Sequence, residues 1–316
     1  MFRKFIVLVI FINIILISFC MKVAASINDK NLNIEECIYK NETLEMAYLM
    51  YLPRDYNSNN KYRLVLFMHG AGDRGFDFSA LRKIDYGFVS KYSNNSEYYN
   101  NTILLVPQCP VPYLWIEADW GSGSYIMTNE EPPAIKAVKE LLDNVVINFN
   151  IDKTRMYAVG VSMGGMAVWD LIGRYPGYFA AAAPICGCLD PSKINEYSKT
   201  PIFTANDKRD TIINANPTIE VVNKLKTMKA DIVYKEYDTS IRNDKSYHST
   251  WIDAYELDQS DDNLYNFIFS HQKNELCVLD KINNNKIILL LLISLLCIGL
   301  TYISFEKKLC VKDDSN

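Results

Sequence analysis

A serine lies in a glycine-rich sequence, GVSMGG at residues 160–165, between an apolar run and a helical pattern. A serine hydroxyl is a poor nucleophile unless it is exposed, deprotonated by a base and close to hydrogen-bond donors for an oxyanion. The G-x-S-x-G pattern is typical of a sharp strand-to-helix turn that presents the serine and has room only for glycine on either side. The alternative is a glycine-rich turn without chemistry. We expect Ser162 to be a nucleophile, with Gly165 easing the packing of the helix on the strand.

The base for this serine is expected among the three histidines of the chain. His271 lies close to a long apolar segment near the C-terminus, and His69 ends an early apolar run. His248 follows the last predicted strand in a polar sequence, and the chain order serine, acid, histidine is one that this type of turn uses. We therefore expect His248 to be the base.

The acid that orients the histidine is expected after the apolar run 201–205, where Asp207 and Asp210 are the candidates. Asp210 is preferred because it comes just before a short apolar pair that would fix the loop, while Asp207 stays open as the residue nearer the strand. The carboxylate would hold the histidine tautomer and stabilise the imidazolium. Asp238 and Asp244 are expected to be surface carboxylates.

An acyl-transfer site also needs two backbone N–H groups for the oxyanion. One is expected from Met163, at the start of a helix whose dipole favours negative charge. The second is expected from Ala71 or Gly72, which follow His69 and Gly70 at the end of an early strand, where glycine lets backbone donors approach.

Segment 109–131 is long for a loop in a compact domain, and such loops more often carry function than fill space. It contains Trp115 and Trp120, together with Tyr113 and Tyr125. These rings are candidates for a substrate pocket above the nucleophile. The equally open alternative is that they pack the loop onto the domain.

The elements that must position these residues alternate along the chain. Apolar runs predict strands over residues 62–68, 102–106, 156–160, 179–185, 201–205 and 231–237. Helical periodicity predicts helices over residues 132–149, 163–174 and 217–228. This alternation predicts an α/β fold, with a mostly parallel central sheet and helices on both faces.

Several motifs in combination resemble the esterase and "predicted peptidase" group of α/β hydrolases. They are HGAGDRG (69–75), PQCP (107–110) with Trp115, DKTRMYAVGVSMGG (152–165), the loop with Asp210, and YHSTW (247–251). This group is similar to polyhydroxybutyrate depolymerases, feruloyl esterases and other carboxylesterases, and more distantly to dienelactone hydrolases. The resemblance covers most of residues 45–270.

The resemblance implies the α/β-hydrolase fold and hydrolysis of small or polymeric carboxylic esters. Ser162, Asp210 and His248 would form the triad, with an acyl-enzyme on the serine. A cysteine nucleophile is disfavoured because position 162 is serine, and FTAN at 203–206 departs from the His-Gly that relatives often have there. A serine peptidase of the same fold is one alternative. A catalytically silent, membrane-anchored adhesion or binding domain is another.

Both ends of the chain read as targeting segments. Basic residues, an apolar run and small residues predict a secretory signal peptide over residues 1–25, with an uncleaved anchor as the alternative. Near the C-terminus, the apolar stretch within residues 286–306 is long enough for a transmembrane helix. The hydrolase domain would span 26–285 outside the cytosol, and 307–316 would form a cytosolic tail. This is a single-pass type I arrangement in the secretory pathway or at the cell surface.

The net charge of −4 and the lack of a basic stripe argue against a nucleic-acid partner. No His or Cys spacing typical of zinc occurs, and we expect neither a metal nor an organic cofactor. The predicted exported part contains an odd number of cysteines, Cys37, Cys109, Cys186, Cys188 and Cys277. In an oxidising compartment at least one thiol would therefore stay unpaired within the chain.

Overall fold

The central element is a nine-stranded sheet within the part of the chain that the computed structural model describes, residues 22–29, 32–242 and 244–274. The strands are β1 (Lys22–Asp29), β2 (Leu32–Lys40), β3 (Glu45–Leu52), β4 (Tyr62–Met68), β5 (Thr102–Pro107), β6 (Ile151–Val161), β7 (Ala181–Ile185), β8 (Ile202–Asn206) and β9 (Ile232–Glu236). Their order is β1-β2-β3-β5-β4-β6-β7-β8-β9. The six strands from β5 to β9 run parallel, and β1, β2 and β3 add an antiparallel edge.

The two predicted targeting segments fall largely outside the described residues. The predicted transmembrane helix over 286–306 and the tail over 307–316 lie there entirely, and so does residue 277. Of the predicted signal peptide over 1–25, residues 1–21 also lie outside the described residues, and residues 22–25 form the start of β1. Within the described residues, no helix combines the length and the apolar character needed to cross a bilayer.

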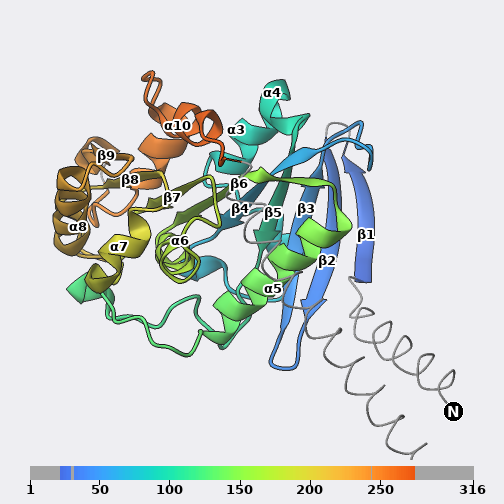
Figure 1. Ribbon diagram of the computed structural model, residues 1–316. Coiled ribbons are helices and arrows are strands. Elements are labelled where there is room, and N and C mark those ends of the chain that lie inside the picture. The colour runs from blue at the N-terminus through green and yellow to red at the C-terminus, as the bar shows by residue number, and fades with distance from the viewer. Residues whose placement is uncertain (1–21, 30–31, 243, 275–316) are drawn as a thin grey trace, which may run out of the picture. The chain divides into compact units, whose positions relative to one another are not determined.

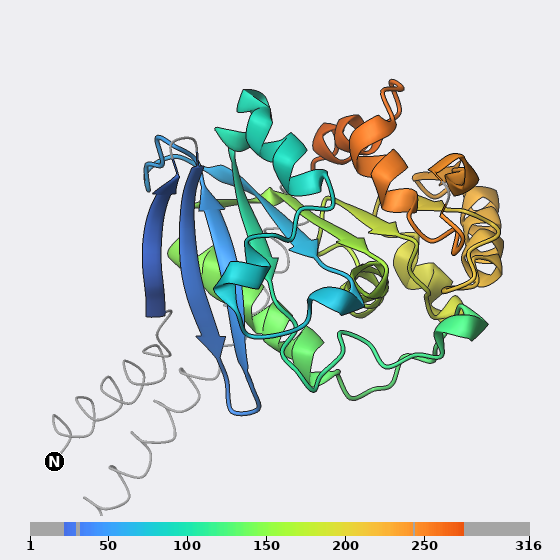
Figure 2. The same ribbon diagram turned by 180° about the vertical axis from the view of Figure 1, so that it is seen from behind.

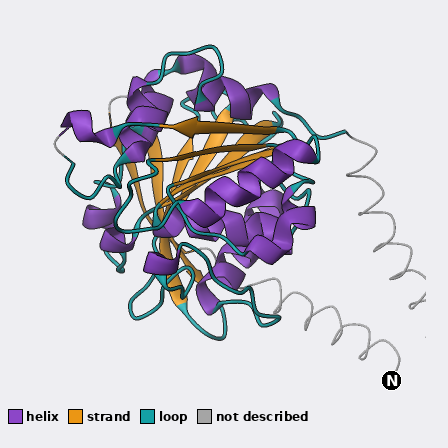
Figure 3. Ribbon diagram, turned by 90° about the vertical axis from the view of Figure 1, so that its left-hand side faces the viewer, coloured by secondary structure: helices purple, strands orange, loops and turns teal. Residues whose placement is uncertain are grey.

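Helices cover both faces of the sheet, as Figures 1, 2 and 3 show. One face carries α5 (Pro133–Asn148), α6 (Met163–Arg174), α7 (Ile194–Tyr197) and α8 (Asn216–Thr227). The other face carries α2 (Phe78–Leu81), α3 (Phe88–Asn94), α4 (Ser96–Tyr99) and α10 (Leu264–Ser270). Single-turn elements lie at η1 (Ala71–Asp73), η2 (Trp120–Ser122), η3 (Pro191–Lys193), η4 (Thr239–Arg242), α9 (Thr250–Ile252) and η5 (Asp253–Leu257).

The central strands are apolar on both sides because both sides are buried. In β4, Leu64 and Leu66 pack into the core under α5 and α6, whereas Val65 and Phe67 pack into the core under α3 and α10. This double burial explains why the run at 62–68 contains little but apolar residues. It also explains why the strand is visible in the sequence.

The predicted α/β architecture with a mostly parallel sheet is confirmed. Strand β4 and helix α6 have the predicted bounds, and β6 begins earlier than predicted, at Ile151. The sequence reading assigned nothing to β2 and β3. Strand β3 (EMAYLMYL) is rich in Met, Ala and Leu, which are good helix formers, and it becomes a strand because β2 and β5 pair with it.

Candidate active site

Ser162 occupies a strained turn between β6 and α6. Its backbone lies at φ 56° and ψ −121°, in a region that residues other than glycine rarely adopt. A Cβ added at Gly160 would lie 2.3 Å from the Gly164 carbonyl oxygen, and one at Gly164 would lie 2.0 Å from the Met68 carbonyl oxygen. A Cβ at Gly165 would lie 2.5 Å from the carbonyl oxygen of a β7 residue. The glycines are therefore required by backbone contacts, as the sequence pattern predicted.

Three side chains that the sequence singled out meet at the carboxyl edge of the sheet. The His248 Nε2 lies 2.8 Å from the Ser162 Oγ, and the His248 Nδ1 lies 2.6 Å from the Asp210 Oδ2. Asp210 and His248 are both buried. With Nδ1–H donating to the carboxylate, Nε2 is free to accept the serine proton, which is the tautomer that a general base requires.

The two candidate acids have different partners. The second oxygen of Asp210, Oδ1, accepts the backbone N–H groups of Ile212 at 2.8 Å and Ile213 at 2.9 Å, which fixes the carboxylate towards His248. Asp207 instead accepts hydrogen bonds from Arg209 and Thr239. Burial alone would raise the pKa of the Asp207 carboxyl, but these hydrogen bonds outweigh it and hold the pKa well below its usual range.

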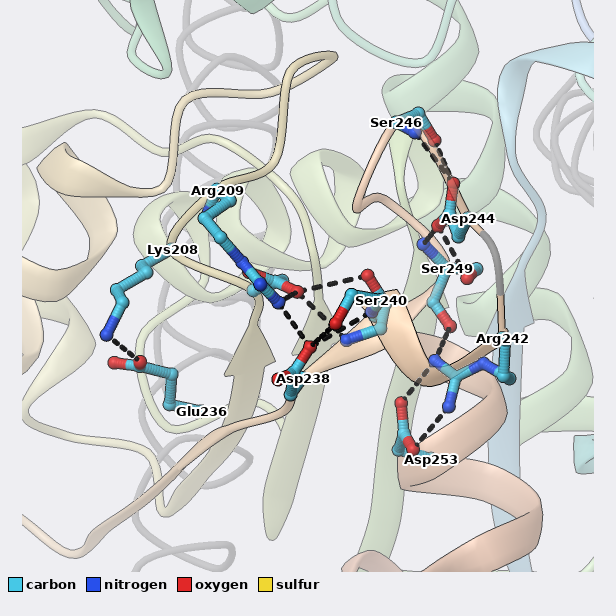
Figure 4. A network of polar contacts seen from close by, with 12 residues as sticks. Lys208, Arg209, Glu236, Asp238, Ser240, Arg242, Asp244, Ser246, Ser249 and Asp253 are labelled. Atoms are coloured by element: carbon cyan, nitrogen blue, oxygen red, sulfur yellow. Dashed lines mark hydrogen bonds and ion pairs between the residues drawn. The ribbon is translucent and has the colours of Figure 1, made fainter.

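The histidine loop is held by a carboxylate that the sequence reading placed on the surface. Asp244 accepts the backbone N–H and hydroxyl of Ser246, and it also accepts the backbone N–H of Ser249 at 2.8 Å and its hydroxyl at 2.6 Å. Figure 4 shows this carboxylate between the two serines. The expectation of a plain surface carboxylate is wrong for Asp244, because its hydrogen bonds span His248 and close the loop.

Further contacts join the histidine loop to its surroundings. Arg242 pairs with Asp253 through two nitrogens, both at 2.6 Å, and donates to the Ser249 carbonyl oxygen (Figure 4). The guanidinium of Arg209 lies 4.5 Å from the centre of the Tyr247 ring. Since Arg209 also pairs with Asp207, the acid loop and the histidine loop are connected by this stacked pair.

The loop after β4 is organised by the buried residue His69. Its Nδ1 lies 2.6 Å from the Gly70 carbonyl oxygen, and its Nε2 accepts the Cys109 N–H at 2.9 Å. Burial lowers the pKa of His69 to about 4, so the ring is neutral near pH 7 and donates from Nδ1. A trans peptide directs its C=O and N–H groups in opposite directions. The N–H of Ala71 therefore points away from His69.

The predicted oxyanion donors have different surroundings. Met163 is the first residue of α6, so its N–H has no acceptor within the helix. Ala71 is partly buried, and the preceding Gly70 lies against Ser162, since a Cβ built there would be 3.7 Å from the serine Cβ. Gly72 is exposed, with nothing within 4 Å of its Cβ position. Of the two candidates in this loop, Ala71 has the better placement.

The two tryptophans of segment 109–131 differ in role. Trp115 is fully buried, and its indole Nε1 donates to the His69 carbonyl oxygen at 3.1 Å. It packs the loop onto the domain and offers no surface to a substrate. Trp120 is partly exposed, and its carbonyl oxygen accepts the N–H groups of Gly123 and Asn214. A Cβ at Gly123 would lie 2.0 Å from the Asn214 carbonyl oxygen, so the loop is pressed against the segment that carries Asp210.

Two aromatic residues near the serine were not singled out from the sequence. The Trp251 ring lies edge-on to His248, with centroids 5.6 Å apart, and the Tyr86 ring lies edge-on to Trp251 at 5.7 Å. Trp251 belongs to the YHSTW motif, which could have drawn attention to it. Tyr86 lies in the loop between α2 and α3, packs against the same core cluster as Trp251, and carries no sequence signal.

One cavity of the described residues lies away from the serine. It has a volume of about 360 Å³ and lies between segment 113–133 and α6, with Asp170 and Arg174 in its wall. Asp170 is eight residues after Ser162, about 12 Å along the helix at 1.5 Å per residue. Within residues 22–274, the described His, Cys, Asp and Glu side chains form no group that could hold a metal ion.

Known proteins resemble this chain in sequence and structure. Residues 125–244 match the model of the Dienelactone hydrolase family, a match that includes Ser162 and Asp210 and ends before His248. Poly(3-hydroxyalkanoate) depolymerase C of Paucimonas lemoignei is 39% identical over 51 residues, 16% of this chain and 12% of that protein.

Solved structures extend the likeness over most of the chain. A thermostable esterase superposes with a TM-score of 0.64 at 27% identity, over 77% of this chain and 64% of that chain. An S-formylglutathione hydrolase from Agrobacterium tumefaciens superposes with a TM-score of 0.50 at 15% identity, over 74% of this chain and 96% of that one. This chain thus spans less than two thirds of the esterase and a small part of the depolymerase. The fold is that of the α/β hydrolases, and the resemblance to their esterase group is confirmed.

Proposed function

We propose that this α/β-hydrolase-fold chain is a serine hydrolase that cleaves carboxylic esters through an acyl-enzyme on Ser162. The observation that carries the proposal is the continuous set of contacts from Ser162 Oγ to His248 Nε2 and from His248 Nδ1 to Asp210. Such a set allows the hydroxyl to lose its proton as it attacks. Similarity to an esterase and to the Dienelactone hydrolase family supports the same reaction class.

In the first half of the reaction, Ser162 Oγ attacks the acyl carbon while its proton moves to His248 Nε2. The tetrahedral intermediate then breaks its bond to the alcohol oxygen, which takes that proton from the imidazolium. In the second half, His248 removes a proton from water as the water attacks the acyl-enzyme. The proton returns to Ser162 as the acid leaves. Asp210 stabilises the imidazolium throughout and keeps its own charge.

The oxyanion is stabilised by the N–H groups of Met163 and Ala71. The first lies at the N-terminus of α6, where the helix dipole favours negative charge. The second is turned away from His69 by the bond between the His69 ring and the Gly70 carbonyl. Loss of one such donor typically reduces turnover by about 10²–10³.

An ester is the favoured substrate because the relatives described above include an esterase and a poly(3-hydroxyalkanoate) depolymerase. The name of the depolymerase extends the candidates to polymeric hydroxyacid esters. A peptidase of the same fold would need a general acid positioned to protonate the amine leaving group. The third alternative, a silent adhesion domain, does not require the three side chains to be in contact.

Labelling with a fluorophosphonate probe tests the nucleophile in the full-length chain. The wild type is expected to be labelled, and Ser162→Ala is expected to lose all labelling. Ser198→Ala, which changes the serine directly after α7, whose hydroxyl donates to the Asn195 carbonyl oxygen, serves as the matched control and should be labelled like the wild type. Labelling that persists in Ser162→Ala would refute the assignment.

Turnover of short p-nitrophenyl esters and of dipeptide p-nitroanilides then separates the functions. Ester hydrolysis that depends on Ser162 supports the proposal. Preferential anilide hydrolysis favours a peptidase, and inertness towards both favours the adhesion alternative.

The proposal includes export and anchoring of the hydrolase domain by the segments 1–25 and 286–306, on the sequence evidence alone. Protease protection of intact cells gives the test. Digestion of the hydrolase domain from outside is expected, and protection of the domain in intact cells would refute this orientation.

A further inference from the structure

Tyr86 lies beside the loop after β4 although it is distant from that loop in sequence. Its hydroxyl accepts the Gly70 N–H at 3.3 Å and donates to the Asp73 carboxylate. Both partners belong to the loop that carries Ala71. The backbone of Tyr86 has φ 49°, a left-handed conformation that is unfavourable for a bulky residue. Such conformations persist where the surrounding structure fixes them, and they concentrate at functional sites.

The Tyr86 hydroxyl and the Ser162 side chain both lie beside Gly70. A Cβ built on Gly70 would lie 2.9 Å from the Tyr86 oxygen and 3.7 Å from the Ser162 Cβ. A single methyl group at position 70 would therefore contact both residues. No side chain at position 70 could fit without displacing Tyr86.

Both polar backbone groups of Gly70 are occupied. Its carbonyl oxygen accepts the His69 Nδ1–H, and its N–H donates to the Tyr86 hydroxyl. Tyr86 thus holds the His69–Gly70 peptide through its N–H, and His69 holds the following Gly70–Ala71 peptide through its carbonyl oxygen, so Gly70 is fixed on both of its sides. With Gly70 fixed, the next donor along the chain, the Ala71 N–H, has a defined direction.

The Tyr86 ring is itself fixed by aromatic neighbours. It packs against Phe67 of β4, with centroids 6.1 Å apart, and against Trp251, which in turn packs against His248. Tyr86 therefore links β4 to the segment that carries His248.

We propose that Tyr86, oriented by Asp73, is a positioning residue that fixes the His69–Gly70 peptide and, through Gly70, the direction of the second oxyanion donor, the Ala71 N–H. This inference rests on the proposed function. The inference adds a second pair to that function. The Tyr86 hydroxyl and the Asp73 carboxylate would act on the oxyanion side of the serine, whereas His248 and Asp210 act on its proton.

Tyr86→Phe removes the hydroxyl and keeps the ring. Because the Ala71 donor would be misdirected and not lost, kcat on a short p-nitrophenyl ester is expected to fall by about 10-fold, less than the ~10²–10³ for deleting a donor. KM is expected to stay unchanged, because the oxyanion forms only after binding. The inhibition constant of a boronic acid, which forms a tetrahedral anion on the serine, should rise by the same factor as kcat falls.

Asp73 supplies the second half of the test. Asp73→Ala is expected to match Tyr86→Phe, whereas Asp73→Asn, which still offers an oxygen to the hydroxyl, should retain activity within about threefold of the wild type. If the pair acts as a unit, the double variant Tyr86→Phe/Asp73→Ala is no slower than either single variant. Effects that multiply would overturn the proposal.

Tyr92→Phe is the matched control. Tyr92 lies on the same face of the sheet, is fully buried, and donates its hydroxyl to the Thr102 carbonyl oxygen at 2.6 Å, away from the serine. The Tyr92→Phe variant should have a lower free energy of unfolding and an unchanged kcat. An unchanged kcat in Tyr86→Phe, or a rise in KM with kcat intact, would overturn the inference while leaving the proposed nucleophile in place. Persistence of activity in Ser162→Ala would instead remove the proposed function itself.

Discussion

The backbone N–H of Asp210 donates to the backbone carbonyl oxygen of Asp207 at 3.1 Å, so one turn of the chain presents two carboxylates to different partners. Asp210 faces His248, and Asp207 faces Arg209 and Thr239. The pair makes a direct comparison possible, because the same substitution three residues apart should affect different properties.

Asp210→Asn is expected to reduce kcat by about 10⁴, because an amide at this position favours the wrong histidine tautomer. Asp207→Asn is expected to keep kcat within a few-fold and to lower the free energy of unfolding by about 1–3 kcal/mol, because buried hydrogen bonds are weakened. Ester kinetics and urea unfolding measure the two quantities. The reverse pattern would identify Asp207 as the acid.

Asp244→Ala removes the four hydrogen bonds that close the loop around His248. We expect kcat to fall by about 10-fold or more, because small displacements of a reacting group cost that much. Asp261→Ala, which removes an exposed carboxylate in a distant turn, is the control. Equal activity of the two variants would show that the loop holds His248 without Asp244.

His69 makes the stability of the fold dependent on pH. Its pKa is about 4 in the folded chain, against an ordinary value of 6.5, so the unfolded chain takes up the proton first on acidification. Stability is therefore constant above pH 6.5 and falls as the pH drops from 6.5 to 4, by about 3 kcal/mol from this residue. In His69→Gln, the free energy of unfolding measured in urea should change less steeply with pH over this window. A constant difference between wild type and variant at every pH would contradict the prediction.

Gly164→Ala places a methyl group 2.0 Å from the Met68 carbonyl oxygen, a backbone atom that cannot move aside. The expected loss of stability is about 3 kcal/mol or more. Gly121→Ala is the control, because its nearest neighbour would be the Asp119 carboxylate at 3.5 Å. Thermal unfolding of both variants measures the difference, and similar midpoints would show that the turn after Ser162 can relax.

Much of this arrangement could be predicted because the central strands are buried on both faces and carry continuous apolar runs. The turn at Ser162 could be predicted because local backbone contacts require glycine at positions 160 and 164. The chain order of Ser162, Asp210 and His248 follows from the fold, and elimination among three histidines was enough to select His248.

What the sequence did not indicate depends on contacts between distant segments. Tyr86 lies between α2 and α3 and contacts Gly70 and Asp73 only in the folded chain, and no local pattern marks that approach. Asp244 resembles any polar loop residue until its serine partners are placed around it. Trp115 was grouped with candidate pocket residues because an indole in a long loop has the same sequence appearance whether it is buried or exposed.

The contact between Gly123 and Asn214 limits how the long segment 109–131 can be re-engineered. Its tip is attached to the stretch that orients Asp210, so a graft or insertion near Trp120 would displace the carboxylate that holds His248. Residues 125–131, beyond that attachment, hydrogen-bond to Asp170, Asp190 and Arg174 and to none of the triad residues, so side-chain substitutions there should affect turnover less than changes at the tip. A library meant to change substrate preference should therefore diversify that arm and leave the tip intact.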